Sequence, residues 1–225
     1  MDHQLDQELE HIKQQIILME DNVERAIFNA YKSLMERDDN LARKVFELER
    51  EINTLDVEIE EDCIKTIALR QPVAVDLRFI ITAMKITSYL ERIGDLAVNI
   101  AERVLELNEE PPIKPYIDLP KVFEIVRLMI RDALRSFVER NAELAYKVIK
   151  EDDKVDKFTE QIGNELTLFM IKDPSTINRA QKITFLTKYL ERIADHAENI
   201  ARSVIYLVEG RMIRHTLPSN STSQV

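Results

Sequence analysis

The stretch YLERIGDLAVNI at residues 89–100 returns one hundred residues later as YLERIADHAENI at residues 189–200. Over the longer windows 89–107 and 189–207, 12 of 19 positions are identical. A second pair of segments, ERDDNLARKV at 36–45 and ERNAELAYKV at 139–148, shares Glu, Arg, Leu, Ala, Lys and Val at matching places. The chain therefore contains two copies of one unit.

Each unit shows the apolar spacing of three helices. From Leu5 to Leu34 apolar residues recur in alternating steps of three and four, which is typical of a packed helix. A second run begins at Leu41 and ends near the RQP of residues 70–72, because the residue before a proline avoids the helical region. A third run follows Pro72 and reaches Leu107. In the second unit the same pattern predicts helices over about 121–140, 142–172 and 175–209.

The segments between these runs set the organisation of the chain. NEEPPIKPYIDLP at 108–120 has no apolar period and indicates a linker. Long helices joined by short connections pack antiparallel to their neighbours. We therefore predict an all-α protein of two similar antiparallel three-helix bundles, with six long helices that arise from an internal duplication. The first bundle is assigned to residues 1–110, the second to residues 111–210, and a flexible tail to residues 211–225.

Composition excludes several classes of function. The net charge of −10 and the pI near 5.1 argue against a nucleic-acid binder, which needs clustered Lys and Arg. No apolar run reaches the roughly 20 residues that span a bilayer, and the start is acidic, unlike a signal peptide. The single cysteine, Cys63, lies in a helical stretch and is expected to be buried. These features predict a cytoplasmic protein that reaches a membrane only through partners.

The repeated stretch carries two carboxylates on the polar side of its helix. Glu91 and Asp95 point away from the apolar face, and so do Glu191 and Asp195 in the second copy. Acids four residues apart on a helix repel each other, so the pair does not stabilise its own helix. The repeated Asn99 and Asn199 extend the same stripe by one turn and are candidate extra ligands. A solvated acidic face is the alternative interpretation, but packing alone does not require polar residues to repeat.

Counting from each helix turn brings further oxygen ligands to the same height. Four residues meet in each unit if the second and third helices are antiparallel. Carboxylates gathered in this way favour a hard cation that neutralises them, such as iron(III), Mn²⁺, Mg²⁺ or Ca²⁺, over a structural zinc. The predicted ligand sets are Glu49, Asn53, Glu91 and Asp95 in the first unit, and Asp152, Asp156, Glu191 and Asp195 in the second.

Taken together, LERIGD at 90–95, LERIAD at 190–195, RQPVAVDLR at 70–78 and EDDKVD at 151–156 resemble the PhoU family over about residues 5–210. The resemblance implies two three-helix bundles and multinuclear metal clusters held by the acidic pairs. Iron is the first candidate, with Mn, Mg, Ca or Zn as the others. The first unit departs from the family pattern because Asn53 stands where a second acid is expected, which implies a weaker site or fewer ions there.

The resemblance also implies a function. PhoU proteins are accessory, negative regulators of phosphate uptake and of the phosphate-starvation response. This chain would then contact the ATPase or permease of a phosphate ABC transporter and a phosphate-sensing histidine kinase, and would form a homodimer. Arg70, Gln71 and Arg78 are candidates for part of the docking surface. The alternative for that segment is a plain helix–turn–helix corner, with Asp76 and Arg78 in the first turns of a helix.

Two other classes of protein compete with this interpretation. A metal-free helical adaptor, of spectrin-like or BAG-like shape, would need only the exposed helix faces. A ferritin-like di-iron carboxylate enzyme would need Glu-x-x-His motifs in a bundle core. Of the four histidines, His3, His11, His196 and His215, only His11 follows a Glu at that spacing, and the enzyme design needs two such motifs on different helices. With three glycines in total and no Gly-rich phosphate loop, the sequence predicts a protein that is not an enzyme.

Overall fold

The computed structural model describes residues 3–113, 116 and 118–211, and this part of the chain is helical without a strand. The all-α prediction is confirmed, and the predicted tail lies outside the described residues from position 212 onward. The helices are α1 (His3–Glu36), α2 (Asp39–Arg70), α3 (Ala74–Asn108), α4 (Leu119–Glu139), α5 (Ala142–Lys172) and α6 (Ile177–Glu209), with a short 3₁₀ turn, η1 (Pro174–Thr176), before α6.

The turns that begin α2 and α5 are built alike. Asp38 and Asn141 stand at matching places in the two units. The Asp38 side chain accepts a hydrogen bond from the Asn40 amide, and that of Asn141 accepts one from Leu144. The residues just before them, Arg37 and Arg140, both adopt a left-handed backbone, with φ of 54° and 52°. The duplication thus extends to the backbone of the corners.

The start of α6 differs from the prediction. A helix was expected from about residue 175, whereas α6 begins at Ile177. The Asp173 side chain accepts a hydrogen bond from the Ser175 amide, and this local bond holds residues 174–176 in a 3₁₀ turn instead of an α-helical one.

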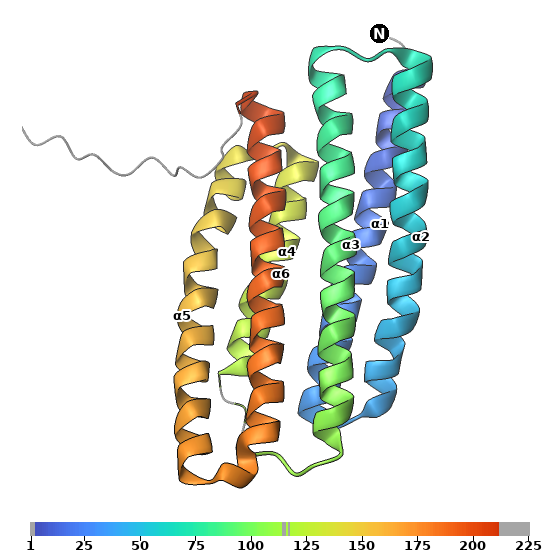
Figure 1. Ribbon diagram of the computed structural model, residues 1–225. Helices are drawn as coiled ribbons and strands as arrows, with labels where there is room; N and C mark the ends of the chain where they lie inside the picture. The colour runs from blue at the N-terminus through green and yellow to red at the C-terminus, as the bar shows by residue number, and fades with distance from the viewer. Residues whose placement is uncertain (1–2, 114–115, 117, 212–225) are drawn as a thin grey trace, which may run out of the picture.

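The six helices form two three-helix bundles that lie side by side (Figure 1). Helices α1 to α3 make one bundle and α4 to α6 the other. Helices α3 and α6 pack against each other at the centre, and α1 contacts α4 behind them. The α2–α3 corner and the α5–α6 corner lie at opposite ends of the molecule, so α3 and α6 are antiparallel.

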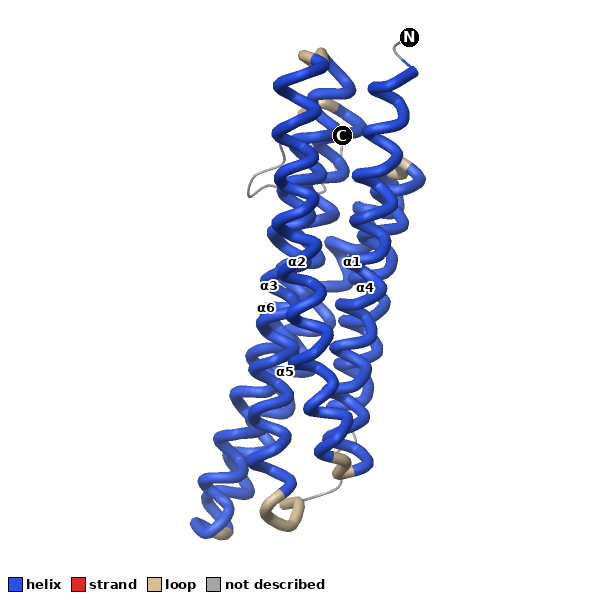
Figure 2. Tube along the Cα trace, turned by 90° about the vertical axis from the view of Figure 1, so that its right-hand side faces the viewer, coloured by secondary structure: helices blue, strands red, loops and turns tan. Residues whose placement is uncertain are grey.

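The helices all run along the long axis of the molecule, as the view from the side shows (Figure 2). Helix α3, with 35 residues, is about 52 Å long. The apolar stripe predicted on α3 is fully buried at Leu90, Ile93, Ala97 and Ile100. None of the described helices has a stretch long and apolar enough to cross a membrane.

Gly94 is a place in the repeated stretch where the two bundles pack side chains of different size. A Cβ added there would lie 3.2 Å from Cδ1 of Ile52, closer than an ordinary contact. The second unit has Ala194 and Val155 at the matching positions, and both are buried. A larger residue on α6 is thus accompanied by a smaller one on α5.

We expect Gly94→Ala and Ile52→Val to compensate each other. The alanine gains helix propensity but presses on the Ile52 side chain, and the valine removes Cδ1, the nearer of the two methyl groups that the alanine meets. In a double-mutant cycle measured by urea unfolding, the two changes together should be more stable than their sum by about 1 kcal/mol. Purely additive effects would show that Ile52 moves aside without cost.

Candidate metal centres

The acidic residues predicted in the second unit meet on the α5–α6 pair. Asp152 and Asp156 come from α5, and Glu191 and Asp195 from α6. Burial raises the pKa of Asp195, and so do the charges of Glu191 and Asp156. Burial and then Glu191 likewise raise the pKa of Asp156. Asp195 therefore lies within electrostatic range of the other three acids.

Asp152 is the most strongly affected carboxyl of this group. Burial raises its pKa to about 7, and the charges of Glu198, Asp195 and Asp156 add to the effect in that order. The helical pattern predicts that these acids point away from the core, and Asp156 and Asp195 are exposed. Asp152 and Glu191, however, are half-buried, because the neighbouring helix covers part of each side chain.

Glu198 is a member of this cluster that sequence reasoning missed. It raises the pKa of Asp152, Asp156 and Asp195, and its carboxylate forms an ion pair of 2.6 Å with Arg202. Its place three residues after Asp195 puts it on the same helix face. The first unit has Val98 at the matching position, so a search for repeated acids does not find it.

Glu191, like Glu198, has a cationic partner on its own helix. The Lys188 ammonium lies 2.6 Å from its Oε2 atom, and the Thr159 hydroxyl donates to the same oxygen at 3.3 Å. This carboxylate is thus held in place from both its own helix and α5.

The first unit assembles a related cluster on the α2–α3 pair. Burial raises the pKa of Glu91, followed by the charges of Asp95, Asp56 and then Glu49. The Asn53 amide nitrogen donates to Glu49, while its Oδ1 atom is buried without a hydrogen-bond partner. An acceptor oxygen of this kind, beside carboxylates, is suited to a bound cation.

Asp56 is the second residue that the sequence did not reveal. Burial raises its pKa, with a contribution from Glu60. It stands where the second unit has Thr159, so it too lies outside the repeated pattern. The first cluster therefore gains one acid that offsets the amide at Asn53.

The two candidate extra ligands lie one turn further along each third helix and are half-buried. The Asn199 amide nitrogen donates to the main-chain oxygen of Asp195 at 2.8 Å, which ties the side chain to its own helix. A cation would be coordinated by the Oδ1 atom of Asn199, which is the acceptor of the side-chain amide. Asn99 has the same amide group and would coordinate a cation in the same way.

Both clusters fit a hard cation by their donors, which are all oxygen, and by the mutual repulsion of their carboxyl groups. Among the described residues, no three His, Cys, Asp or Glu side chains already stand in the arrangement that holds one metal ion. A bound cation would supply charge that neutralises the carboxylates. In the first cluster the acids that would hold a cation are Glu49, Glu91 and Asp95, and in the second they are Asp152, Asp156, Glu191 and Asp195.

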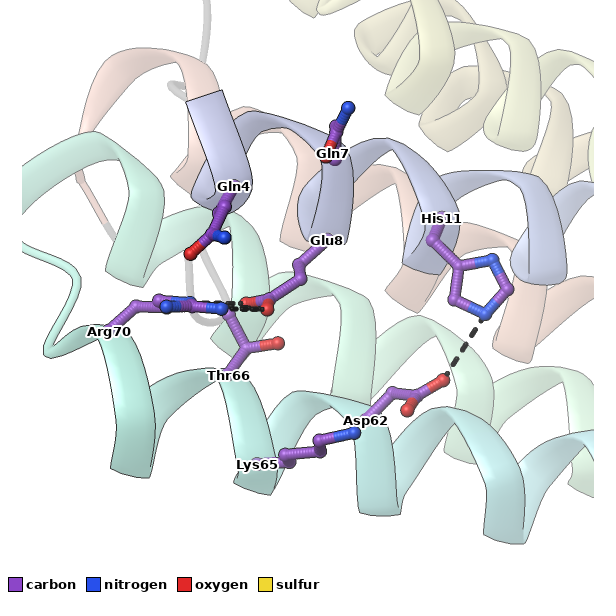
Figure 3. Close-up of a pocket in the computed structure, with 8 residues that line it drawn as sticks. All are labelled: Gln4, Gln7, Glu8, His11, Asp62, Lys65, Thr66 and Arg70. Atoms are coloured by element: carbon purple, nitrogen blue, oxygen red, sulfur yellow. Dashed lines mark hydrogen bonds and ion pairs between the residues drawn. The ribbon is translucent and has the colours of Figure 1, made fainter. Parts of the chain in front are cut away.

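Two of the three residues predicted to dock a partner also contact other helices of this chain. Arg70 donates to both oxygens of Glu8, at 2.7 and 3.1 Å, and so ties the end of α2 to α1 beside a polar pocket (Figure 3). Gln71 is an exposed left-handed cap at the end of α2. Arg78 lies against Gly210, at the end of α6 in the other bundle. Arg70 and Arg78 thus hold elements of the corner in place.

The PhoU domain family matches the chain twice, at residues 16–104 and 119–204, which together span more than half of its length. The chain belongs to the PhoU family. Each of the two family matches covers most of one three-helix bundle.

Individual relatives resemble this PhoU-family chain over nearly its whole length. It is 45% identical to the phosphate-specific transport system accessory protein PhoU homolog of Aquifex aeolicus over 208 residues, which are 92% of this chain and 94% of that protein. The crystal structure of PhoU from Pseudomonas aeruginosa superimposes with a TM-score of 0.89 at 38% identity, covering 92% of this chain and 99% of that one. The phosphate transport system regulatory protein PhoU from Streptococcus pneumoniae gives a TM-score of 0.86 at 28% identity, covering 93% and 99%.

Proposed function

We propose that this protein is an accessory regulator of high-affinity phosphate uptake and that it acts by metal-dependent docking. The observation that carries the proposal is the pair of carboxylate clusters at matching positions of the two bundles, in a member of a family named for phosphate transport. Its relatives are called accessory or regulatory proteins of the phosphate transport system. Long helix faces are suited to docking, which needs contact area and no chemical step.

Within this proposal, the cation sets the charge of the docking face. Without it, the α5–α6 cluster holds five carboxyl groups close together, which favours protonation or separation of the side chains. With a cation, iron first among the candidates, the same groups are neutralised and fixed. The partners are the ATPase or permease of a phosphate ABC transporter and a phosphate-sensing histidine kinase, whose starvation response the docked regulator keeps off when phosphate is plentiful. Docking occurs on the cytoplasmic side, and the regulator is a homodimer.

Co-purification tests the proposal directly. The protein is isolated from cells grown at high and at low phosphate, its metal content is measured by mass spectrometry, and the transporter ATPase and the kinase are quantified in the same sample. Glu91→Gln and Asp95→Asn, combined with Glu191→Gln and Asp195→Asn, disable both clusters and should lower both the metal content and the amount of partner by about tenfold.

The control removes two acids that are also four residues apart but lie outside the clusters. Glu47 and Glu51 are exposed on α2, and Glu47→Gln with Glu51→Gln should leave metal and partners unchanged. Loss of metal with full retention of both partners would leave the metal-free adaptor as the better description. Absence of both partners at either phosphate level would remove the regulatory function.

A further inference from the structure

A small cationic pocket lies on the seam between the two bundles. Helix α3 provides its lining, and its volume is about 260 Å³. Helix α6 lies alongside, since the Tyr89 ring is 5.8 Å from the ring of His196 and the Lys85 ammonium is 5.5 Å from the centre of the Tyr206 ring. The lining residues are Met84, Lys85, Ser88, Tyr89 and Arg92.

The positive charges around the pocket come from both bundles. Lys85 and Arg92 are contributed by α3, and Arg192 by α6. The guanidinium groups of Arg92 and Arg192 both lie within electrostatic range of the His196 imidazole. In the part of the chain that the structure describes, none of these three cations lies within 4.0 Å of a carboxylate in an ion pair. They converge in a protein whose net charge is −10.

Comparison of the two units shows that packing does not demand this arrangement. The residues that match Lys85 and His196 in the other copy are Phe185 and Leu96, both apolar. Tyr206 stands where the first unit has Glu106. At the other end of the seam Glu106 forms an ion pair with Lys182, whereas Lys85 faces the Tyr206 ring instead of an acid. The pseudo-symmetry of the molecule is therefore broken at this end by Lys85, which faces an aromatic ring where the other end has an ion pair.

We propose that the pocket between α3 and α6 binds a small tetrahedral oxyanion, with inorganic phosphate as its ligand. Arg and Lys donate charge-assisted hydrogen bonds to phosphate oxygens, and the Ser88 and Tyr89 hydroxyls add neutral ones. The volume lies below the roughly 300 to 1,000 Å³ of pockets that hold drug-sized ligands, which favours a small ion over a nucleotide. The inference goes beyond the proposed function, because metal-dependent docking does not require a site for phosphate.

Calorimetric titration of the full chain tests this site, after treatment with a chelator so that phosphate cannot bind through a metal. Inorganic phosphate is titrated at constant ionic strength set with chloride, and glycerol phosphate is titrated in parallel as a monoester. We expect saturable binding of one phosphate per chain. Lys85→Met with Arg92→Met should weaken it by at least about tenfold, since two charged donors are lost.

Two further variants separate a binding role from a structural one. Arg43→Met with Lys44→Met removes two exposed cations elsewhere on α2, and phosphate binding should be unchanged. Lys85→Arg keeps the charge and should keep the affinity within about threefold. Absence of saturable binding, equal weakening in the Arg43/Lys44 control, or tighter binding of the monoester than of free phosphate would each overturn the proposal. None of these outcomes bears on metal-dependent docking, because the protein carries no metal in this experiment.

Discussion

Replacing Asp152 with asparagine is expected to stabilise the metal-free protein by about 1 to 2 kcal/mol at pH 8. Burial and the neighbouring carboxylates raise the pKa of Asp152 from 3.8 to about 7. A shift of this size in a fully buried group would amount to about 4 kcal/mol, and solvent screening of the half-buried side chain reduces it. Asparagine keeps the shape of the side chain and removes the charge that the cluster repels.

The same substitution should flatten the dependence of stability on pH. Because the pKa of Asp152 is higher in the folded state, the folded protein binds the proton more tightly than the unfolded chain does. This contribution to stability is present below about pH 4 and is lost as the pH rises toward 7. The free energy of unfolding of the variant should therefore match the original at pH 4 and exceed it at pH 8. Glu20, whose pKa burial also raises to about 7, contributes equally to both proteins and cancels in the difference.

A cation should reverse the ranking of the two proteins. At a free metal concentration one hundred times the dissociation constant, binding to the folded state adds about 2.7 kcal/mol, and the variant should lose most of that gain. Urea unfolding with and without Fe²⁺ under anaerobic conditions, or with Mn²⁺, measures both effects. Glu160→Gln is the control, since Glu160 is an exposed acid further along the same helix. If Asp152→Asn destabilised the metal-free protein, repulsion within the cluster would not be the dominant interaction there.

The helices and the height of the acids along them could be predicted because both depend only on distance along the chain. A duplicated apolar pattern gives helix lengths, and short corners make neighbours antiparallel, so Asp152 and Asp195 must meet. Rotation of each helix about its axis is set by side-chain packing, which the sequence does not display. The sequence analysis missed Asp56 and Glu198 for this reason. The rotation of their helices brings them to the clusters, and neither residue has an acid at the matching position of the other unit.

The way in which one bundle packs against the other could not be predicted from the sequence either. Its apolar stripes predict three helices around a core but do not say which further faces meet. Leu96 on α3 is buried, although the repeat places His196 at the matching position of α6. Arg78, a candidate for a partner surface because RQPVAVDLR resembles a family motif, also lies against the end of α6, which the sequence does not predict. Such contacts between distant segments depend on the tertiary arrangement.

The second large effect is expected for Phe137→Ala, which should lower the free energy of unfolding by about 3 to 5 kcal/mol. Phe137, at the end of α4, is almost completely buried and stacks on Phe79 of α3, with ring centres 5.3 Å apart and planes inclined by 19°. The two rings come from different bundles. Removal of one leaves a cavity in the region that joins them, which the long, rigid helices cannot easily close.

A double-mutant cycle with Phe79→Ala measures how much of this loss belongs to the stacked pair. Each single change removes the ring contact, so the second removal should cost less than the first by about 0.5 to 1.5 kcal/mol. Thermal and urea unfolding followed by circular dichroism gives the four stabilities needed. Strictly additive losses would mean that each ring is held by its own bundle alone. A coupling of the expected size would identify the Phe79–Phe137 stack as a contact through which the two bundles stabilise each other.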